Sequence, residues 1–276
     1  MRTLISGVFA AVLLASVPAL VLAAGGQGTA QGVTPSADAQ LEGATRTLVV
    51  GADIFIGDLV ETGPKGQVQI LFADNTHLVV GPQSSLKIDD YLLRNNGDAG
   101  KFVVDMLSGS FRFATGNGPK AKYEINTPTG TIGVRGTGFD VFVDVTGWAR
   151  ILHHIGTVIF KANGEKVWQT LHDACTVGEI RGGAAKVLGN SKSMTGTMHN
   201  DLKAEFRYSD NQSPLLHPYW FANALDCLHT APDNGQPPSL SNNTNQGPST
   251  AAPTTPGAPP LRVVGVFLPA GPGVLR

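Results

Sequence analysis

Glycine, proline and asparagine residues divide most of this chain into short apolar runs, and this feature limits the possible fold more than any other. From Thr47 to Gly189 the runs arrive roughly every 8–12 residues, a spacing typical of strands joined by turns. In several runs, large apolar side chains recur at alternate positions, as Phe102, Val104 and Met106 do. With 34 glycines, 18 prolines and only 15% charged residues, the composition favours strands over long surface helices. We predict an all-β, multi-stranded fold, either a sandwich or a compact solenoid, which the pattern does not separate.

The N-terminus has the pattern of a secretory signal. Met1 and Arg2 precede an apolar run through Leu22, and small residues stand before Ala24. We therefore expect export to the periplasm or the cell surface, with no membrane span after cleavage. The alternative is an uncleaved anchor, because Leu4–Leu22 approaches the ~20 apolar residues that cross a bilayer. Either way, only two residues precede the run, which leaves no room for a cytosolic domain.

Composition then predicts the organisation of the rest. The segment after the signal is rich in small polar residues and has no apolar periodicity. Further along, Met198, Leu202 and Phe206 lie four residues apart, which predicts a helix. An apolar cluster from Tyr219 to Leu228, after Pro218, predicts a second helix. The segment after Ala231 has almost no apolar residues and is predicted to be disordered. The predicted segments are a signal peptide (1–23), a flexible leader (24–44), a β domain (45–189), a helical cap (190–230), a disordered linker (231–260) and a C-terminal strand able to join a sheet edge (261–276).

One stretch, residues 126–141, combines a turn with a strand. Pro128 fixes φ and Gly130 permits the turn, and a strand with alternating valines follows. The Thr127-Pro128 pair followed by Val134-Arg135-Gly136-Thr137-Gly138-Phe139 resembles the signature of the FecR-like domain. The resemblance covers a core of residues 47–145, including Gly57–Gly63 and Leu107–Phe111. Its signature residues in this chain are Thr127, Pro128, Arg135, Gly136, Thr137 and Phe139.

This resemblance implies an all-β extracytoplasmic module that relays signals between an outer-membrane receptor and a sigma factor. The chain would hold the sensing part without the cytosolic anti-sigma part. We therefore expect an exported, non-catalytic protein-interaction or sensing module whose partner is an envelope protein, such as an outer-membrane receptor or a membrane regulator. The alternative is a structural envelope protein that binds polysaccharide or peptidoglycan.

Arg135 lies between small residues, and two roles are open for it. Its guanidinium could bind backbone carbonyls or a nearby carboxylate, Asp140 or Asp144, or it could present a charge to a partner. His153 and His154 are adjacent, which on a strand places their rings on opposite faces. We expect one of these rings to pack and the other to face solvent.

Cys175 and Cys227 are the only cysteines. In an exported protein two cysteines usually form a disulfide, which here would tie the helical cap to the β domain. Zinc is an alternative, because His172 and His229 lie near the two thiols, and free thiols are a third possibility.

Composition and motifs also argue against several functions. A net charge of −1 and a pI near 6.6 argue against a nucleic-acid partner. We find no paired acid and base, no nucleophile elbow and no phosphate-binding loop. The glycines of residues 133–138 lead into a strand, which disfavours a nucleotide site. We therefore predict no enzymatic activity, no cofactor and no metal.

Overall fold

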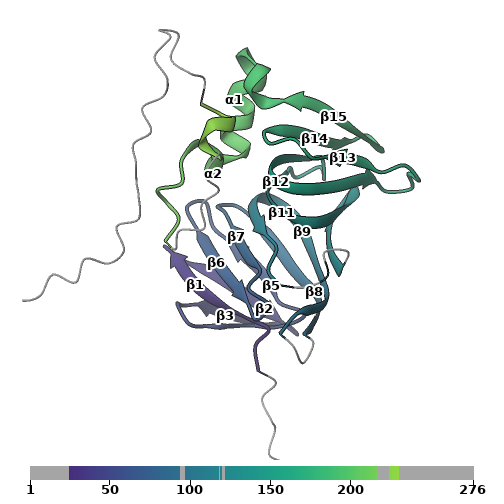
Figure 1. The fold of residues 1–276 in the computed structure, drawn as a ribbon. Coiled ribbons are helices and arrows are strands. Elements are labelled where there is room, and N and C mark those ends of the chain that lie inside the picture. Colours follow the sequence, from purple (N-terminus) through teal and green to yellow (C-terminus); the bar gives the residue numbers. More distant parts are fainter. Residues whose placement is uncertain (1–24, 94–96, 118, 120–121, 217–223, 230–276) are drawn as a thin grey trace, which may run out of the picture. The chain divides into compact units, whose positions relative to one another are not determined.

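The computed structural model describes residues 25–93, 97–117, 119, 122–216 and 224–229. The chain divides into two units, residues 1–230 and 231–276, and the second contains no described residue. The predicted signal peptide, disordered linker and C-terminal strand therefore lie outside the described residues. Figure 1 shows the described part as a large assembly of strands with a few helical turns. The prediction of an all-β fold with a small helical segment is confirmed.

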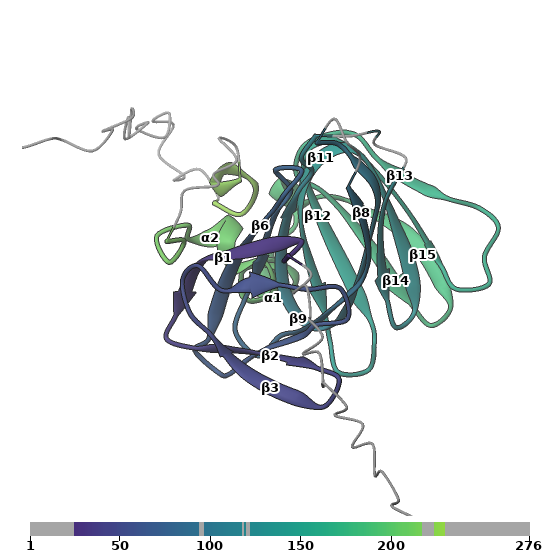
Figure 2. The ribbon, with the colours of Figure 1, turned by 90° about the horizontal axis from the view of Figure 1, so that it is seen from below.

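All fifteen strands of the described residues belong to one hydrogen-bonded network. Figure 2 shows β14 and β15 side by side beyond β12. In chain order the strands are β1 (Gly28–Thr34), β2 (Ala37–Leu41), β3 (Ala44–Leu48), β4 (Asp53–Ile54), β5 (Leu59–Thr62), β6 (Gln67–Phe72), β7 (His77–Val80), β8 (Ser85–Leu93), β9 (Ala99–Ala114), β10 (Tyr123–Thr127), β11 (Gly130–Val143), β12 (Ala149–Ala162), β13 (Gln169–Leu171), β14 (Thr176–Arg181) and β15 (Ala184–Asn190).

The network folds into two layers that share three long strands. The N-terminal part of β9 pairs with β8 and β10, whereas its C-terminal part pairs with β7 and β11. Strands β11 and β12 change partners in the same way along their length. One layer therefore runs β3-β2-β5-β8-β9-β10-β11-β12-β13, and the other runs β4-β1-β6-β7-β9-β11-β12-β14-β15. Strands that switch sheets in this way form the corners of sandwiches, the first of the two predicted arrangements.

Each shared strand passes from one layer to the other near a glycine with positive φ. These glycines are Gly109 in β9 (φ 107°), Gly136 in β11 (φ 69°) and Gly156 in β12 (φ 86°). The register between β11 and β12 also shifts just after Arg135. A Cβ at Gly156 would overlap the carbonyl oxygen of Gly136, so the two backbones approach closely at the bend.

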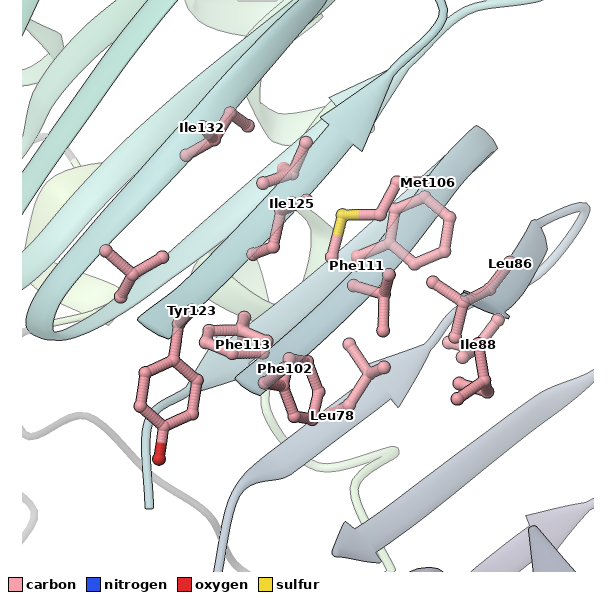
Figure 3. Close-up of a cluster of buried hydrophobic side chains, with 14 of the residues drawn as sticks. Leu78, Leu86, Ile88, Phe102, Met106, Phe111, Phe113, Tyr123, Ile125 and Ile132 are labelled. Carbon is pink, nitrogen blue, oxygen red and sulfur yellow. The ribbon is translucent and has the colours of Figure 1, made fainter. Parts of the chain in front are cut away.

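The core lies between the two layers and is rich in aromatic residues. Phe72 of one layer meets Phe102 of the other edge to face, with ring centroids 4.9 Å apart, and Phe113 and Tyr123 also meet across the interface at 6.4 Å. Figure 3 shows neighbours of these rings, including Leu78, Ile88 and Met106, directed into the same cluster. The side chains that the strands direct between the layers thus form one continuous core.

The prediction of a flexible leader over residues 24–44 is wrong from Gly28 onward. Strand β1 lies between β4 and β6, and β2 lies between β3 and β5. Their buried side chains are alanines, Ala30, Ala37 and Ala39, all at most 1% exposed. Small side chains at alternate positions give a weak apolar signal in the sequence, although they are sufficient where the layers pack closely.

A helical segment follows β15 and covers the outer face of the second layer. Leu202 and Phe206 are buried there, as their spacing predicted. The Ser110 hydroxyl donates to the Glu205 carbonyl oxygen at 2.9 Å, and Ser191 Oγ donates to the Cys227 carbonyl oxygen at 2.6 Å. The predicted second helix lies partly outside the described residues. The helical elements are η2 (Ser191–Ser193), α1 (Gly196–Glu205), α2 (Arg207–Asp210) and η3 (Leu225–Cys227), which together we call the helical cap.

Candidate functional site

The structure divides the signature residues into two groups. Thr127, Thr137 and Phe139 are buried, and the Thr127 hydroxyl donates to the Gly130 carbonyl oxygen at 3.1 Å across the turn. Gly136 forms the bend of β11. Only Pro128 and Arg135 are exposed, and the Pro128 carbonyl oxygen already accepts a hydrogen bond from Asn163. Arg135 is therefore the exposed signature residue whose side chain can form an ion pair with a partner.

Arg135 has no ion-pair partner among the described residues. Of the two roles left open for it, a contact with the Asp140 or Asp144 carboxylate is not formed. Asp140 binds Arg112 instead, and Asp144 accepts from the backbone N–H groups of Thr146 and Trp148 in the turn after β11. The guanidinium of Arg135 is consequently a solvated charge on the outer face of the first layer.

Apolar side chains occupy neighbouring positions of β11, β12 and the segment before β13. Gly133 lies two residues before Arg135 on the same face of β11. A Cβ added at Gly133 would contact the side chains of Ile159 and Trp168, so these side chains lie over the glycine. The Trp168 indole is 40% exposed, and the Lys161 ammonium lies 4.9 Å from its ring centroid. Ile155, in β12 close to the bend, is 59% exposed. We call Arg135, Ile155, Ile159, Lys161 and Trp168 the signature face.

The opposite side of the molecule holds a buried polar network under the helical cap. The Arg112 guanidinium binds both Asp140 oxygens, at 2.7 and 2.9 Å, and donates to Gln212 Oε1 at 2.7 Å. Burial disfavours the Asp140 carboxylate, but the charges and hydrogen bonds of Arg112 and His154 hold the pKa of that carboxyl below its usual value. Ser209 completes the network, since its hydroxyl donates to Asp140 Oδ2 at 2.7 Å.

Ser209, His154 and Asp140 are the residue types of a nucleophilic triad, but their hydrogen bonds differ from one. The single Ser209 hydroxyl proton goes to Asp140, so His154 Nε2, 3.0 Å from Ser209 Oγ, can only donate there. Asp140 also lies on the Nε2 side of the ring, at 3.3 Å, where a triad needs the carboxylate at Nδ1. Since all three side chains are buried, the arrangement holds the cap in place and does not activate Ser209.

A second buried ion pair connects the cap to β12. Arg150 Nη1 lies 2.8 and 3.0 Å from the two Glu205 oxygens, and its guanidinium stacks 4.2 Å from the Trp148 ring centroid. The Glu179 carboxylate forms ion pairs with both Arg150 and Lys186. Burial nevertheless raises the pKa of Glu205 to about 7, because the Arg150 pair offsets only part of the desolvation.

The prediction that one of the paired histidines faces solvent is wrong, since both are 1% exposed. His153 Nδ1 lies 3.0 Å from the Asp173 carbonyl oxygen on one side of β12, and His154 joins the network on the other. The two rings point to opposite faces of β12, as expected for a strand. The helical cap covers the face that would otherwise be exposed to solvent. Burial lowers the pKa of His154, which favours its neutral form.

Cys175 and Cys227 form a disulfide, as predicted, and it joins the start of β14 to η3. Both thiols are thereby used, which overturns the zinc and free-thiol alternatives. His172 and His229 are exposed and lie near Asp173 and Asp210 respectively. Within the described residues we find no group of three metal-ligating side chains and no helix long and apolar enough to cross a bilayer.

The sequence contains one signal for the buried network, the position of Arg112. Arg112 stands between Phe111 and Phe113 in an apolar strand, so it must point to the face opposite the core. A charged side chain on that face, near the centre of a layer, indicates that another segment with polar side chains packs over it. The partners Ser209 and Gln212 lie about a hundred residues further along the chain and carry no comparable pattern.

These observations define a two-layer β domain with a disulfide-linked helical cap and one exposed charged and apolar face. Residues 58–150 match the family model described as FecR protein. This match covers most of the region whose sequence resembles the FecR-like domain. The match spans β9, β10 and β11, and so includes two of the three strands shared by both layers and ends at the start of the third, β12.

Two solved structures resemble part of the chain. Both are proteins from Parabacteroides distasonis ATCC 8503 provisionally described as anti-sigma factors. One is 12% identical with a TM-score of 0.39, covering 48% of this chain and 59% of its own. The other is 13% identical with a TM-score of 0.38, covering 54% and 74%. A search of curated proteins finds no match.

Proposed function

We propose that this chain is an exported, non-catalytic recognition module that binds an envelope protein through the signature face and takes part in signal relay. The observation that carries the proposal is Arg135. The long cations near the centre of the second layer, Arg112 and Arg150, are paired with carboxylates, whereas Arg135 is exposed and unpaired among the described residues. The FecR match supports a regulatory role, since that family is regulatory rather than catalytic.

The composition of the signature face suits a protein partner. An arginine beside an exposed tryptophan and isoleucines has the residue types that contribute most to protein interfaces. We place the module in the periplasm or at the cell surface, in keeping with the predicted signal peptide and the disulfide. The partner would be an outer-membrane receptor or a membrane regulator that presents a carboxylate to Arg135.

The test compares Arg135→Gln with the wild-type chain from Ala24 in affinity capture from envelope extracts. Lys122→Gln is the matched control, because Lys122 is also exposed and has no ion pair among the described residues. We expect one envelope protein to be retained by wild type and Lys122→Gln but lost in Arg135→Gln at an unchanged melting temperature. Equal retention by all three would refute the role of Arg135.

A second candidate function, binding of envelope polysaccharide, is favoured by the exposed Trp168 indole. Aromatic faces with a polar rim stack on sugar rings, and Lys161 supplies part of such a rim. Recovery of glycan or wall fragments alone, lost in Trp168→Ala but kept in Arg135→Gln, would favour this function over signal relay.

A further inference from the structure

A groove of about 670 Å³ lies between the helical cap and the turns of the second layer. Pro64 and Pro82 come from turns that flank β5, β6 and β7, Tyr208 comes from the cap, and Pro214 and Leu216 come from the segment after α2. This volume is within the range of small-molecule sites, and its walls are largely apolar. We call it the cap groove.

The charges that line the cap groove do not balance. Lys65, Lys203 and Arg207 are cationic, whereas Asp210 is the single carboxylate among the described lining residues. Asp210 is already occupied by Lys203 at 3.1 Å, with His229 at 3.7 Å. Lys65 and Arg207 therefore face the groove from two different elements without an ion-pair partner among the described residues.

The polar groups of the groove floor are already satisfied. The Tyr208 hydroxyl donates to Gln67 Oε1 at 2.8 Å, and Gln67 Nε2 donates to the Pro214 carbonyl oxygen at 3.0 Å. These bonds fix the floor before any ligand arrives. A ligand would thus gain by apolar contact with the walls and by an anionic group placed between Lys65 and Arg207.

The part of the chain outside the described residues has few carboxylates to supply this anion. Outside the described residues, the sequence contains one acidic side chain, Asp233. We propose that the cap groove binds an amphiphilic small molecule with an apolar body and one carboxylate or phosphate head. The site is separate from the signature face, so this inference does not depend on the proposed partner.

The experiment titrates the chain from Ala24 with anilinonaphthalene sulfonate, a fluorescent apolar ring system with one anionic head. Decanoate, decyl phosphate and uncharged decanol then compete for the probe. We expect decanoate or decyl phosphate to displace it at least tenfold more effectively than decanol, and their order to identify the preferred head group. The double variant Lys65→Gln/Arg207→Gln should weaken this displacement about tenfold or more.

Lys192→Gln is the charge control, because Lys192 is an exposed cation of the helical cap that does not line the groove. It should bind the probe and its competitors as the wild type does. Equal displacement by decanol and decanoate, or unchanged displacement in the double variant at an equal melting temperature, would overturn the proposal. Retained displacement in Arg135→Gln would keep it distinct from the signature face.

Discussion

At the scale of single residues, the most demanding feature is the Arg112–Asp140 pair. Both side chains are at most 2% exposed, so each charge has lost its hydration and depends on the other. Ser209 of the helical cap and Gln212, just after α2, supply further hydrogen bonds to Arg112. The pair therefore links the cap to the sheet, because the cap supplies hydrogen bonds to both buried charges.

Arg112→Ala should lower the free energy of unfolding by about 3–5 kcal/mol, since it leaves the Asp140 carboxylate buried without its cation. Chemical denaturation at neutral pH measures this loss. Lys87→Ala is the control, because the Lys87–Asp89 pair is nearly half exposed on both sides and should cost at most about 1 kcal/mol. Equal losses in the two variants would contradict the role assigned to burial.

At the scale of elements, the helical cap is a small unit that needs long-range support. Helix α1 has ten residues and α2 only four, too few for stable helices on their own. Their support comes from the buried polar contacts and from the disulfide between Cys175 and Cys227, which are 52 residues apart.

Replacement of both cysteines, Cys175→Ala/Cys227→Ala, should reduce the free energy of unfolding by about 4 kcal/mol, the value that chain entropy gives for a loop of this length. The loss should be local at first. In hydrogen exchange we expect the amides of α1 and α2 to lose protection well before those of β9, which serve as the internal control. A uniform loss over both regions would mean that the cap and the sheet unfold together.

The elements also show what a sequence can predict. Strands with large alternating side chains, such as Phe102 to Met106, were identified, and so was the helical spacing of Leu202 and Phe206. Strands β1 and β2 were missed because alanine is weakly apolar yet fills a close interface. The burial of both His153 and His154 was missed because it depends on a cap that lies some fifty residues away in the sequence.

At the scale of the whole molecule, the buried acids make stability depend on pH. The pKa of Glu205 is raised to about 7, above its usual value of 4.5. The stability associated with its protonated form is therefore complete below about pH 4.5 and is lost as the pH rises through 7. Arg150 faces this carboxyl directly, and Asp201 and Glu179 add negative charge nearby.

Comparison of the wild type with Glu205→Gln should reveal this dependence. Relative to the variant, the wild type should lose roughly 2–4 kcal/mol of unfolding free energy between pH 5 and pH 8. Asp140 and His154 titrate in both proteins, so their effects cancel in the difference. A difference that stays constant with pH would show that Glu205 ionises in the native state as it does in the unfolded chain.

The three strands shared by both layers also have a mechanical consequence. In a sandwich whose sheets are separate, the interface is a plane along which the sheets can shear when force is applied. Here β9, β11 and β12 cross that plane as continuous covalent chain. A pull on one layer is therefore transmitted through peptide bonds to the other, and the domain should resist tension as a single body until the core itself gives way.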